Sequence, residues 1–559
     1  MLGRRKAQGS LFEAEVWPHP VAPDSIYGRM AKVRDVLFKD DDLAAMYCLD
    51  NGRPSLPPSL LSGVLLLQYH DDVSDEEAVE RLRYDLRWKV ALGLPLDYPG
   101  FDPTSLVVFR KRLLKHGKER YAFERFLKVA REAGFLPEKV RQLIDSSPMK
   151  GAGATQDTYT LLRKGIRRLL RSLGFAVPEK RRGLQADLGR YLDRDKKAEI
   201  DWADPKARAT ELGRLVRDAD AVLELARPQA DDDEVRLIGW MLTKVLGDDV
   251  EIGDDGQPKL GEGVARDRLI SWTDPEMRHG RKSAASRWNG DKLHLAEEPA
   301  SELVTEVEVT EASAGDGKSL LPMVESVEEH LDVKVERVTG DTAYGEAENR
   351  VECAKRGIDL VSPIARPSDP EVDKSAFAID EVKQTLTCPG GQTVGEPRLI
   401  KDPQGRRVCQ FVFPRALCAT CEFFARCVRP RKPSVEANRE ASGEGSETER
   451  RGIGRTVTLH YHESVLRAAR ERQATEEFRA AYRERAKVER KLAELMGHGL
   501  RQARYIGRPK KRLQALWIAA VVNLKRLFKL SKDDLKRLVE ALSSVSSGAP
   551  LPSPTAGRA

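Results

Sequence analysis

The chain has 559 residues, of which 40% are apolar and 33% are charged, so it can bury cores beneath a heavily charged surface. This length predicts about three or four domains, or one domain with large insertions. A membrane protein is excluded by the absence of any run of roughly 20 apolar residues, and the N-terminus lacks the apolar core of a signal peptide.

The net charge of +7 is placed unevenly along the chain. Residues 500–532 contain ten Lys or Arg residues and no Asp or Glu. Such a segment is expected to bind phosphates, although a basic helix face that only meets water would have the same composition. The sequence therefore predicts a cytoplasmic, nucleoid-associated protein with a polyanionic partner and no contact with a membrane.

The N-terminal part is predicted to be helical. Residues 1–22 are expected to form a flexible arm, and residues 23–138 a helical DNA-binding domain in which Ser74 and Glu77 form a capping box. The helix expected within residues 102–117 has a basic face that would read DNA in a helix-turn-helix arrangement; this face consists of Arg110, Lys111, Arg112 and Lys115. A helical bundle whose basic side only faces solvent explains the same pattern equally well.

Strand-like runs begin at residue 139 and return after residue 265. Runs at 140–145, 268–274, 292–298, 303–310, 333–338 and 358–364 read as strands, and residues 316–331 and 345–357 as helices. The first of these helices carries an apolar stripe of Leu320, Val324, Val327 and Leu331. This order predicts an α/β fold around a mixed sheet. Residues 160–264 are expected to be a helical insertion, residues 366–455 a Cys-rich insertion with a mobile linker, and residues 533–559 a disordered tail. The helical insertion begins with a helix whose apolar face consists of Leu162, Ile166, Leu169, Leu170 and Leu173.

Three carboxylates stand out by their positions. Asp145 and Asp341 each follow a predicted strand, and Asp341 lies in the sequence VTGDTAYG. In YRERAKVERKL, Tyr482, Arg485 and Glu489 are spaced to lie along one face of a helix. Two Asp residues and one Glu suit Mg²⁺, which prefers carboxylate oxygens, although such an Asp is usually a turn residue and such a Glu usually half of a surface ion pair.

These motifs together resemble a known family. Asp145 in LIDSSPMKG, Asp341 in VTGDTAYGEAENR and Glu489 in YRERAKVERKLAEL resemble the DDE triad of bacterial insertion-sequence transposases with an RNase H-like core. The basic hairpin at 274–284 and the segment 499–527 extend the resemblance to the IS1182 family, a relative of the IS4/IS5 group. The resemblance covers most of residues 25–530, and each motif would be weak by itself.

The resemblance implies a fold and a reaction. Residues 139–159, 265–365 and 456–532 would form an RNase H-like catalytic core, joined to the all-α N-terminal domain, the helical insertion and a small zinc-ribbon-like insertion. Asp145, Asp341 and Glu489 would hold two Mg²⁺ ions, with Mn²⁺ as a substitute. The partners would be double-stranded DNA, as terminal inverted repeats and as target, and a second copy of the chain in a synaptic homodimer.

The resemblance also implies residues that bind DNA phosphates. These are Tyr482, Arg485, Arg501, Arg504, Arg278, His279, Arg281 and Lys282. The related IS4 signature has a Lys where this chain has Met496, and Arg501 or Arg504 is expected to replace it. Asp291 stands where an aromatic residue is expected, and we interpret it as a hairpin residue rather than an extra acid. If Glu489 is not the third acid, the alternatives are Glu484 and Glu494.

Five of the seven cysteines lie between residues 388 and 427. The spacing of four of them suits tetrahedral Zn²⁺; they are Cys388, Cys418, Cys421 and Cys427. A redox pair and unliganded thiols are the alternatives. Cys409 is expected in a sheet, and Cys48 and Cys353 as small buried residues.

The sequence therefore predicts a DNA transposase that cleaves element ends and joins them to target DNA. Two other functions share most of these features. One is an RNase H-like nuclease that cuts DNA without joining it. The other is a transposase-derived DNA-binding protein that has lost catalysis, for which the missing signature Lys is the argument.

Overall fold

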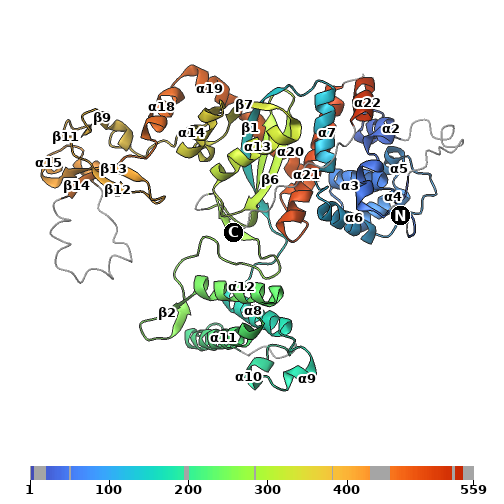
Figure 1. The fold of residues 1–559 in the computed structure, drawn as a ribbon, viewed down its shortest axis with the longest axis horizontal. Coiled ribbons are helices and arrows are strands. Elements are labelled where there is room, and N and C mark those ends of the chain that lie inside the picture. Colours follow the sequence, from blue (N-terminus) through green and yellow to red (C-terminus); the bar gives the residue numbers. More distant parts are fainter. Residues whose placement is uncertain are drawn as a thin grey trace. The chain divides into compact units, whose positions relative to one another are not determined.

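The computed structural model describes residues 2–4, 21–48, 52–193, 200–282, 285–380, 382–428, 453–531 and 535–545. Most of the predicted arm and linker lies outside these residues. The prediction of a disordered tail is wrong for its first part, because residues 535–544 form a helix whose Leu538, Ala541 and Leu542 are buried. The chain divides into two compact units, the first formed by Met1–Glu336 with Ala486–Ala559 and the second by Arg337–Arg485. Figure 1 shows the elements of both.

The N-terminal part of the first unit is helical, as predicted. It contains α2 (Ile26–Leu37), α3 (Pro58–Asp71), α4 (Asp75–Tyr84), α5 (Leu86–Leu92), α6 (Thr104–Lys115) and α7 (Tyr121–Glu132). The Ser74 hydroxyl accepts a hydrogen bond from the Glu77 amide at 3.1 Å, which confirms the predicted cap at the start of α4. Helices α4 and α5 are separated at Asp85, whose carboxylate caps α5 by accepting from the Arg87 amide.

A mixed sheet follows, which confirms the α/β prediction. Its strands are β1 (Lys139–Lys150), β4 (Arg278–Arg281), β5 (Arg287–Glu298), β6 (Leu303–Glu311), β7 (Lys334–Thr339) and β8 (Asp359–Val361). The order is β4-β5-β1-β7-β8, with β6 also paired to β5. Strand β5 is antiparallel to β1, β4 and β6, whereas β7 and β8 are parallel. The boundary between the units falls within β7.

Two helices connect the later strands. Helix α13 (Leu320–Leu331) precedes β7, and its predicted apolar stripe of Leu320, Val324, Val327 and Leu331 is buried. Helix α14 (Ala347–Lys355) connects β7 to β8. The periodicity of apolar residues was therefore a correct guide to these elements.

Two of the predicted strands differ in the structure. Strand β1 continues to Lys150, because its pairing with β5 extends from Leu143–Glu297 to Lys150–Gly290, so Asp145 lies inside the strand rather than at its end. Residues 268–274 form no strand. They follow an irregular path in which the indole of Trp272 donates a hydrogen bond to the Leu161 carbonyl at 2.7 Å.

The helical insertion forms its own bundle within the first unit. Its main helices are α8 (Thr158–Ser172), α11 (Pro205–Ala226) and α12 (Asp233–Asp249), with short α9 (Pro178–Arg181), α10 (Ala186–Gly189) and a hairpin of β2 (Val250–Ile252) and β3 (Pro258–Leu260) (Figure 1). The predicted apolar face of α8, from Leu162 to Leu173, is buried against α11 and α12.

Three helices complete the first unit: α20 (Ala486–Leu495), α21 (Arg508–Leu530) and α22 (Leu535–Ser544). Helix α20 packs on β1 and β5, and α21 packs on β6, α3 and α7. The basic segment 500–532 is thus largely an internal helix. Its expected phosphate-binding character does not hold for Lys511, Arg512 and Lys525, because these cations are paired with carboxylates of the same unit.

The Cys-rich part of the second unit contains two small sheets. One is β9 (Ala378–Asp380), β10 (Thr385–Thr387) and β11 (Thr393–Val394), and the other β12 (Arg398–Lys401), β13 (Arg407–Pro414) and β14 (Ile453–Thr458). Short α15 (Arg415–Ala419) and α16 (Phe424–Cys427) follow β13. The small core consists of Phe377, Leu386, Phe411, Phe413 and Val457, with Cys409 beside it as predicted for a sheet residue.

The second unit ends with α18 (Glu463–Gln473) and α19 (Glu476–Arg483). Glu484 and Arg485 form a turn before α20 begins. Tyr482 and Glu489 therefore belong to different helices, and the prediction that Tyr482, Arg485 and Glu489 share one helical face is wrong.

Candidate functional site

Asp145 and Glu489 both belong to the first unit. Asp145 lies in β1 with only 8% of its surface exposed, and one carboxylate oxygen accepts a hydrogen bond from the Ser146 amide at 2.8 Å. Glu489 is exposed on α20, whose buried side consists of Val488, Lys491, Leu492 and Leu495. The strand and the helix that packs on it thus hold one oriented and one solvent-accessible carboxylate.

Asp341 belongs to the second unit, two residues after β7. Its carboxylate caps the short helical turn Thr342–Tyr344 by accepting a hydrogen bond from the Ala343 amide at 2.9 Å. Its backbone carbonyl accepts from the Ser362 hydroxyl at 2.6 Å. Gly345 closes the motif because a Cβ there would come within 2.4 Å of the Ser362 hydroxyl. The glycine-flanked sequence therefore holds Asp341 in one defined orientation.

The structure does not present a ready-made metal centre. Within the described ranges, no group of three or more His, Cys, Asp or Glu side chains is arranged to hold a metal ion. Asp145 and Glu489 lie in one unit and Asp341 in the other. The triad thus remains a prediction from sequence.

The predicted phosphate-binding residues of the hairpin between β4 and β5 differ in their surroundings. Arg281 and Lys282 are exposed. The Arg278 guanidinium donates a hydrogen bond to the Met277 carbonyl at 2.8 Å. His279 Nδ1 lies 2.7 Å from the Asn289 side-chain oxygen, so the imidazole is oriented by its own hairpin. The hairpin thus exposes two cations, Arg281 and Lys282.

The two arginines expected to replace the signature Lys also differ. Arg504 donates to the Val73 carbonyl at 2.7 Å and forms an ion pair with Asp72, so it links the end of α3 to the segment before α21. Arg501 is exposed, and its carbonyl accepts from the Lys150 amide at 2.9 Å. Of these two, Arg501 is the one whose side chain reaches solvent.

Helix α6 carries the four residues predicted to read DNA. Arg110 is buried and its guanidinium binds the Asp75 carboxylate, with one nitrogen at 2.9 Å. The Arg112 guanidinium stacks over the Tyr47 ring at 4.6 Å. Lys111 and Lys115 are exposed. The same surface exposes Val107 and Val108, by 38% and 44%, which sequence reasoning missed because apolar residues of a helix are expected inside.

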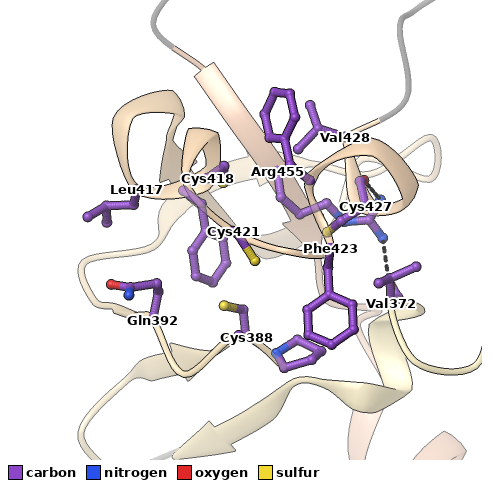
Figure 2. Close-up of a pocket in the computed structure, with 14 residues that line it drawn as sticks. Val372, Cys388, Gln392, Leu417, Cys418, Cys421, Phe423, Cys427, Val428 and Arg455 are labelled. Carbon is purple, nitrogen blue, oxygen red and sulfur yellow. Dashed lines mark hydrogen bonds between the residues drawn. The ribbon is translucent and has the colours of Figure 1, made fainter.

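The four cysteines predicted to bind zinc line one small cavity in the second unit. Cys388, Cys418, Cys421 and Cys427 surround a space of about 20 Å³ that is otherwise lined largely by apolar side chains (Figure 2). Burial raises the pKa of the Cys427 thiol, and the other three sulfur atoms raise it further. All seven cysteines are described and none forms a disulfide.

The backbone around this cavity is shaped to bring the sulfur atoms in. Figure 2 shows the Cys388 and Cys421 side chains on facing sides of the cavity. A Cβ at Gly390 would lie 2.8 Å from the Cys421 sulfur, and Gly391 has a φ of +78°. The CPGG turn therefore needs its glycines for close approach and for a left-handed backbone.

Two groups of side chains escaped prediction. Lys511 is fully buried between Asp274 and Asp291, so Asp291 is neither an extra catalytic acid nor a simple hairpin residue. In the second unit, four unpredicted arginines and Phe478, which stacks on the predicted Tyr482, line a cavity next to Thr342. No local sequence pattern predicts either group, because the members of each group come from separate segments of the chain.

The comparisons with known proteins identify the class. A transposase DDE domain model matches residues 387–528, and a transposase domain model named DUF772 matches residues 18–112. These domains indicate a transposase, an enzyme class that implies DNA as partner and divalent metal use.

The combination of these two domains is characteristic of IS1182-family transposases. Glu489 and all four clustered cysteines fall within the matched DDE range, whereas Asp145 and Asp341 precede it. No curated protein and no solved structure matches the chain. Among the helices of the described residues, none is long and apolar enough to cross a membrane.

Proposed function

We propose that the chain binds the terminal inverted repeats of an insertion sequence, cleaves the DNA strand at each end and joins the ends to target DNA. The order of the strands is the observation that supports this proposal best. Strand β1, which carries Asp145, pairs on one side with antiparallel β5, which in turn pairs with antiparallel β6. On the other side of β1 lie β7 and β8, which are parallel to each other. This arrangement fits the RNase H-like core that the family resemblance implies.

In this proposal Asp145, Asp341 and Glu489 are the catalytic residues. Oxygen ligands of this kind suit Mg²⁺ or Mn²⁺. When bound, two such ions activate water and stabilise the charges on the attacking and leaving oxygens of a phosphodiester. The protein contributes orientation: one backbone amide holds the carboxylate of Asp145 and another that of Asp341.

The exposed cations of the first unit would bind DNA phosphates in this function. Arg281 and Lys282 at the hairpin, together with Arg501, would position the duplex. On α6, Lys111 and Lys115 would contact phosphates or base edges while Val107 and Val108 contact thymine methyl groups. Arg110 and Arg504 would act indirectly, because their ion pairs hold the helices that present these residues.

We also propose that Cys388, Cys418, Cys421 and Cys427 bind one structural Zn²⁺ ion. The chemical type of the donors suits this metal, because four thiolates are a common tetrahedral set. The four side chains would have to move together to bind it, since they do not already form a metal site among the described residues. A space of about 20 Å³ is enough for one water-sized occupant. The ion would stabilise a subdomain whose apolar core is small, much as metals do in other small domains.

The experiment that tests the catalytic proposal compares wild type with Asp341→Asn. Each is incubated with Mg²⁺, a linear DNA that carries the element's own flanking ends, and a supercoiled target. We expect wild type to cleave and join, and Asp341→Asn to bind the ends normally but to lose both reactions by at least about 100-fold. Asp233→Asn, on the exposed side of α12, is the matched control and should stay active.

Each of the other possible results would support a different function or a different catalytic residue. Cleavage without joining by wild type would identify a nuclease. Binding without cleavage by wild type, in Mg²⁺ and in Mn²⁺, would identify a DNA-binding protein that has lost catalysis. Activity in Asp341→Asn would remove Asp341 from the site.

A further inference from the structure

A large open cavity lies in the second unit beside the proposed catalytic residue Asp341. The cavity has a volume of about 730 Å³, and its lining includes Thr342, which directly follows Asp341 in the chain. The segment after β8 (residues 363–367) forms one wall, and helices α18 and α19 form another. We call it the arginine cavity, because its cations are Arg366, Arg470, Arg479 and Arg483.

The charge of the arginine cavity is positive. Its lining, as far as the chain is described, includes four arginines and no Asp or Glu. Two carboxylates outside the lining offset part of this charge: Glu463 lies 3.4 Å from Arg470, and Glu476 lies 2.9 Å from Arg483 and 3.7 Å from Arg479. A surplus of guanidinium groups remains, and guanidinium binds phosphate with two parallel hydrogen bonds.

An aromatic pair lines the same cavity. Phe478 and Tyr482 are one helical turn apart on α19, and their rings stack with centroids 5.9 Å apart and planes 13° apart. Phe478 is buried, whereas Tyr482 is only partly buried. Phosphate-binding cations beside an aromatic platform are the combination that binds nucleotides of single-stranded nucleic acid.

We propose that the arginine cavity binds an unpaired nucleotide of the DNA substrate, with its base stacked at Tyr482 and its phosphates on the arginines. The volume equals that of a sphere about 11 Å across, so the cavity can take a single nucleotide but cannot enclose a duplex, whose major groove alone is about 12 Å wide. A base that stacks on protein must also leave its neighbours in the duplex. This inference rests on the proposed function, since the strand would be held directly beside Asp341.

The test measures binding without added divalent ions, so that it does not depend on cleavage. A labelled ten-nucleotide single strand and the matching duplex are titrated onto wild type and the double variant Arg366→Ala/Arg479→Ala. We expect the variant to lose at least 10-fold in single-strand affinity and less than 2-fold in duplex affinity. The slope of log affinity against log salt should fall by about 1.4 for the single strand, or about 0.7 per lost contact.

Three controls decide the outcome. Arg398→Ala, an exposed arginine of β12 in the same unit, should leave both affinities unchanged. The fluorescence of an oligonucleotide with a terminal 2-aminopurine should be quenched when this base stacks on the ring of residue 482. This quenching should be lost in Tyr482→Leu and kept in Tyr482→Phe. Deoxynucleoside monophosphate should compete at least 100-fold more weakly than the strand, and equal competition would overturn the assignment to DNA.

Equal loss for single strand and duplex, or equal loss in Arg398→Ala, would also overturn the proposal. The result is separate from that of the cleavage experiment. A chain that cleaves and joins but binds single strands normally in the double variant would contradict only this inference. A chain that never cleaves but shows the expected losses would contradict only the catalytic proposal.

Discussion

Lys511 has a different role in the fold from the phosphate binding that its place in the sequence predicts. It stands in the acid-free segment 500–532, yet its ammonium group is wholly buried, 2.7 Å from an Asp274 oxygen and in contact with Asp291. The other oxygen of each carboxylate, Oδ1 of Asp274 and Oδ1 of Asp291, has no hydrogen-bond partner among the described residues. Lys511 therefore compensates two buried carboxylates and ties α21 to β5.

We expect Lys511→Met to destabilise the protein by about 3–5 kcal/mol, because it leaves buried charges without a partner. Lys510→Met, on the exposed side of the same helix, should change stability by less than about 0.5 kcal/mol. Urea unfolding of the two variants and wild type measures the difference. Equal urea midpoints for Lys511→Met and Lys510→Met would show that the buried group of Lys511, Asp274 and Asp291 contributes nothing to the free energy of unfolding.

Glu297 is a second buried charge, located on β5 beneath α20. Only 1% of its surface is exposed, and one carboxylate oxygen has no hydrogen-bond partner in the described part of the chain. Burial raises the pKa of Glu297 to about 7, although Lys491 opposes the shift. The carboxyl group is thus neutral in the folded protein at mildly acidic pH.

This pKa predicts the sign of a pH effect. Between pH 4.5 and 7 the folded state keeps a proton on Glu297 that the unfolded state releases, so stability contributed by this group falls as pH rises, by about 3 kcal/mol in total. Glu297→Gln removes this loss and should be more stable than wild type at pH 8. Urea midpoints at pH 5, 6, 7 and 8 measure it, with exposed Glu251→Gln as control. Parallel pH profiles for wild type and Glu297→Gln would contradict the assignment.

At the scale of elements, the Cys-rich subdomain depends on more than its strands. Its longest strand is β13, of 8 residues, and β11 has only 2. Strands this short with a five-residue core bury little apolar surface, so an additional cross-link is expected for stability. The four cysteines around one cavity are the residues that could provide it through a metal ion.

We expect purified wild type to contain one Zn²⁺ per chain, measured by elemental analysis, and to lose thermal stability when a zinc chelator is added. Cys421→Ser should lose the metal, because its sulfur lines the cavity. Cys409→Ser, in β13 and outside the cavity lining, should retain it. Wild type without zinc, or equal zinc content in Cys421→Ser, would favour unliganded thiols.

Element type was predictable where the pattern was long and regular. The apolar faces of α8 and α13 were read correctly from spacing alone, because helical periodicity is a local property. Breaks were not predictable: Asp85 ends α4 and caps α5, and the turn at Glu484 and Arg485 separates α19 from α20. A break depends on which neighbours satisfy the backbone, which short-range patterns do not contain.

At the scale of the whole molecule, strand transfer requires two DNA ends to be held together. One chain carries one candidate set of Asp145, Asp341 and Glu489. We therefore expect a complex of two chains with two ends, because closed twofold symmetry is the commonest way to bring identical sites together. Light scattering on the chain with end DNA should give this stoichiometry, and DNA with scrambled ends should not. One chain per DNA at every ratio would contradict it.

The sequence by itself determined the order of helices and strands, the candidate carboxylates, the cysteine spacing and the family resemblance, because these are properties of residues close together in the chain. Only the tertiary structure decided which charges are available. Arg110 meets Asp75 across 35 positions, Lys511 meets Asp291 across 220 and Arg504 meets Asp72 across 432. Burial and ion pairing depend on neighbours in space, which the sequence does not show. In the fold these cations form ion pairs within the protein, whereas the sequence alone predicted that they bind DNA.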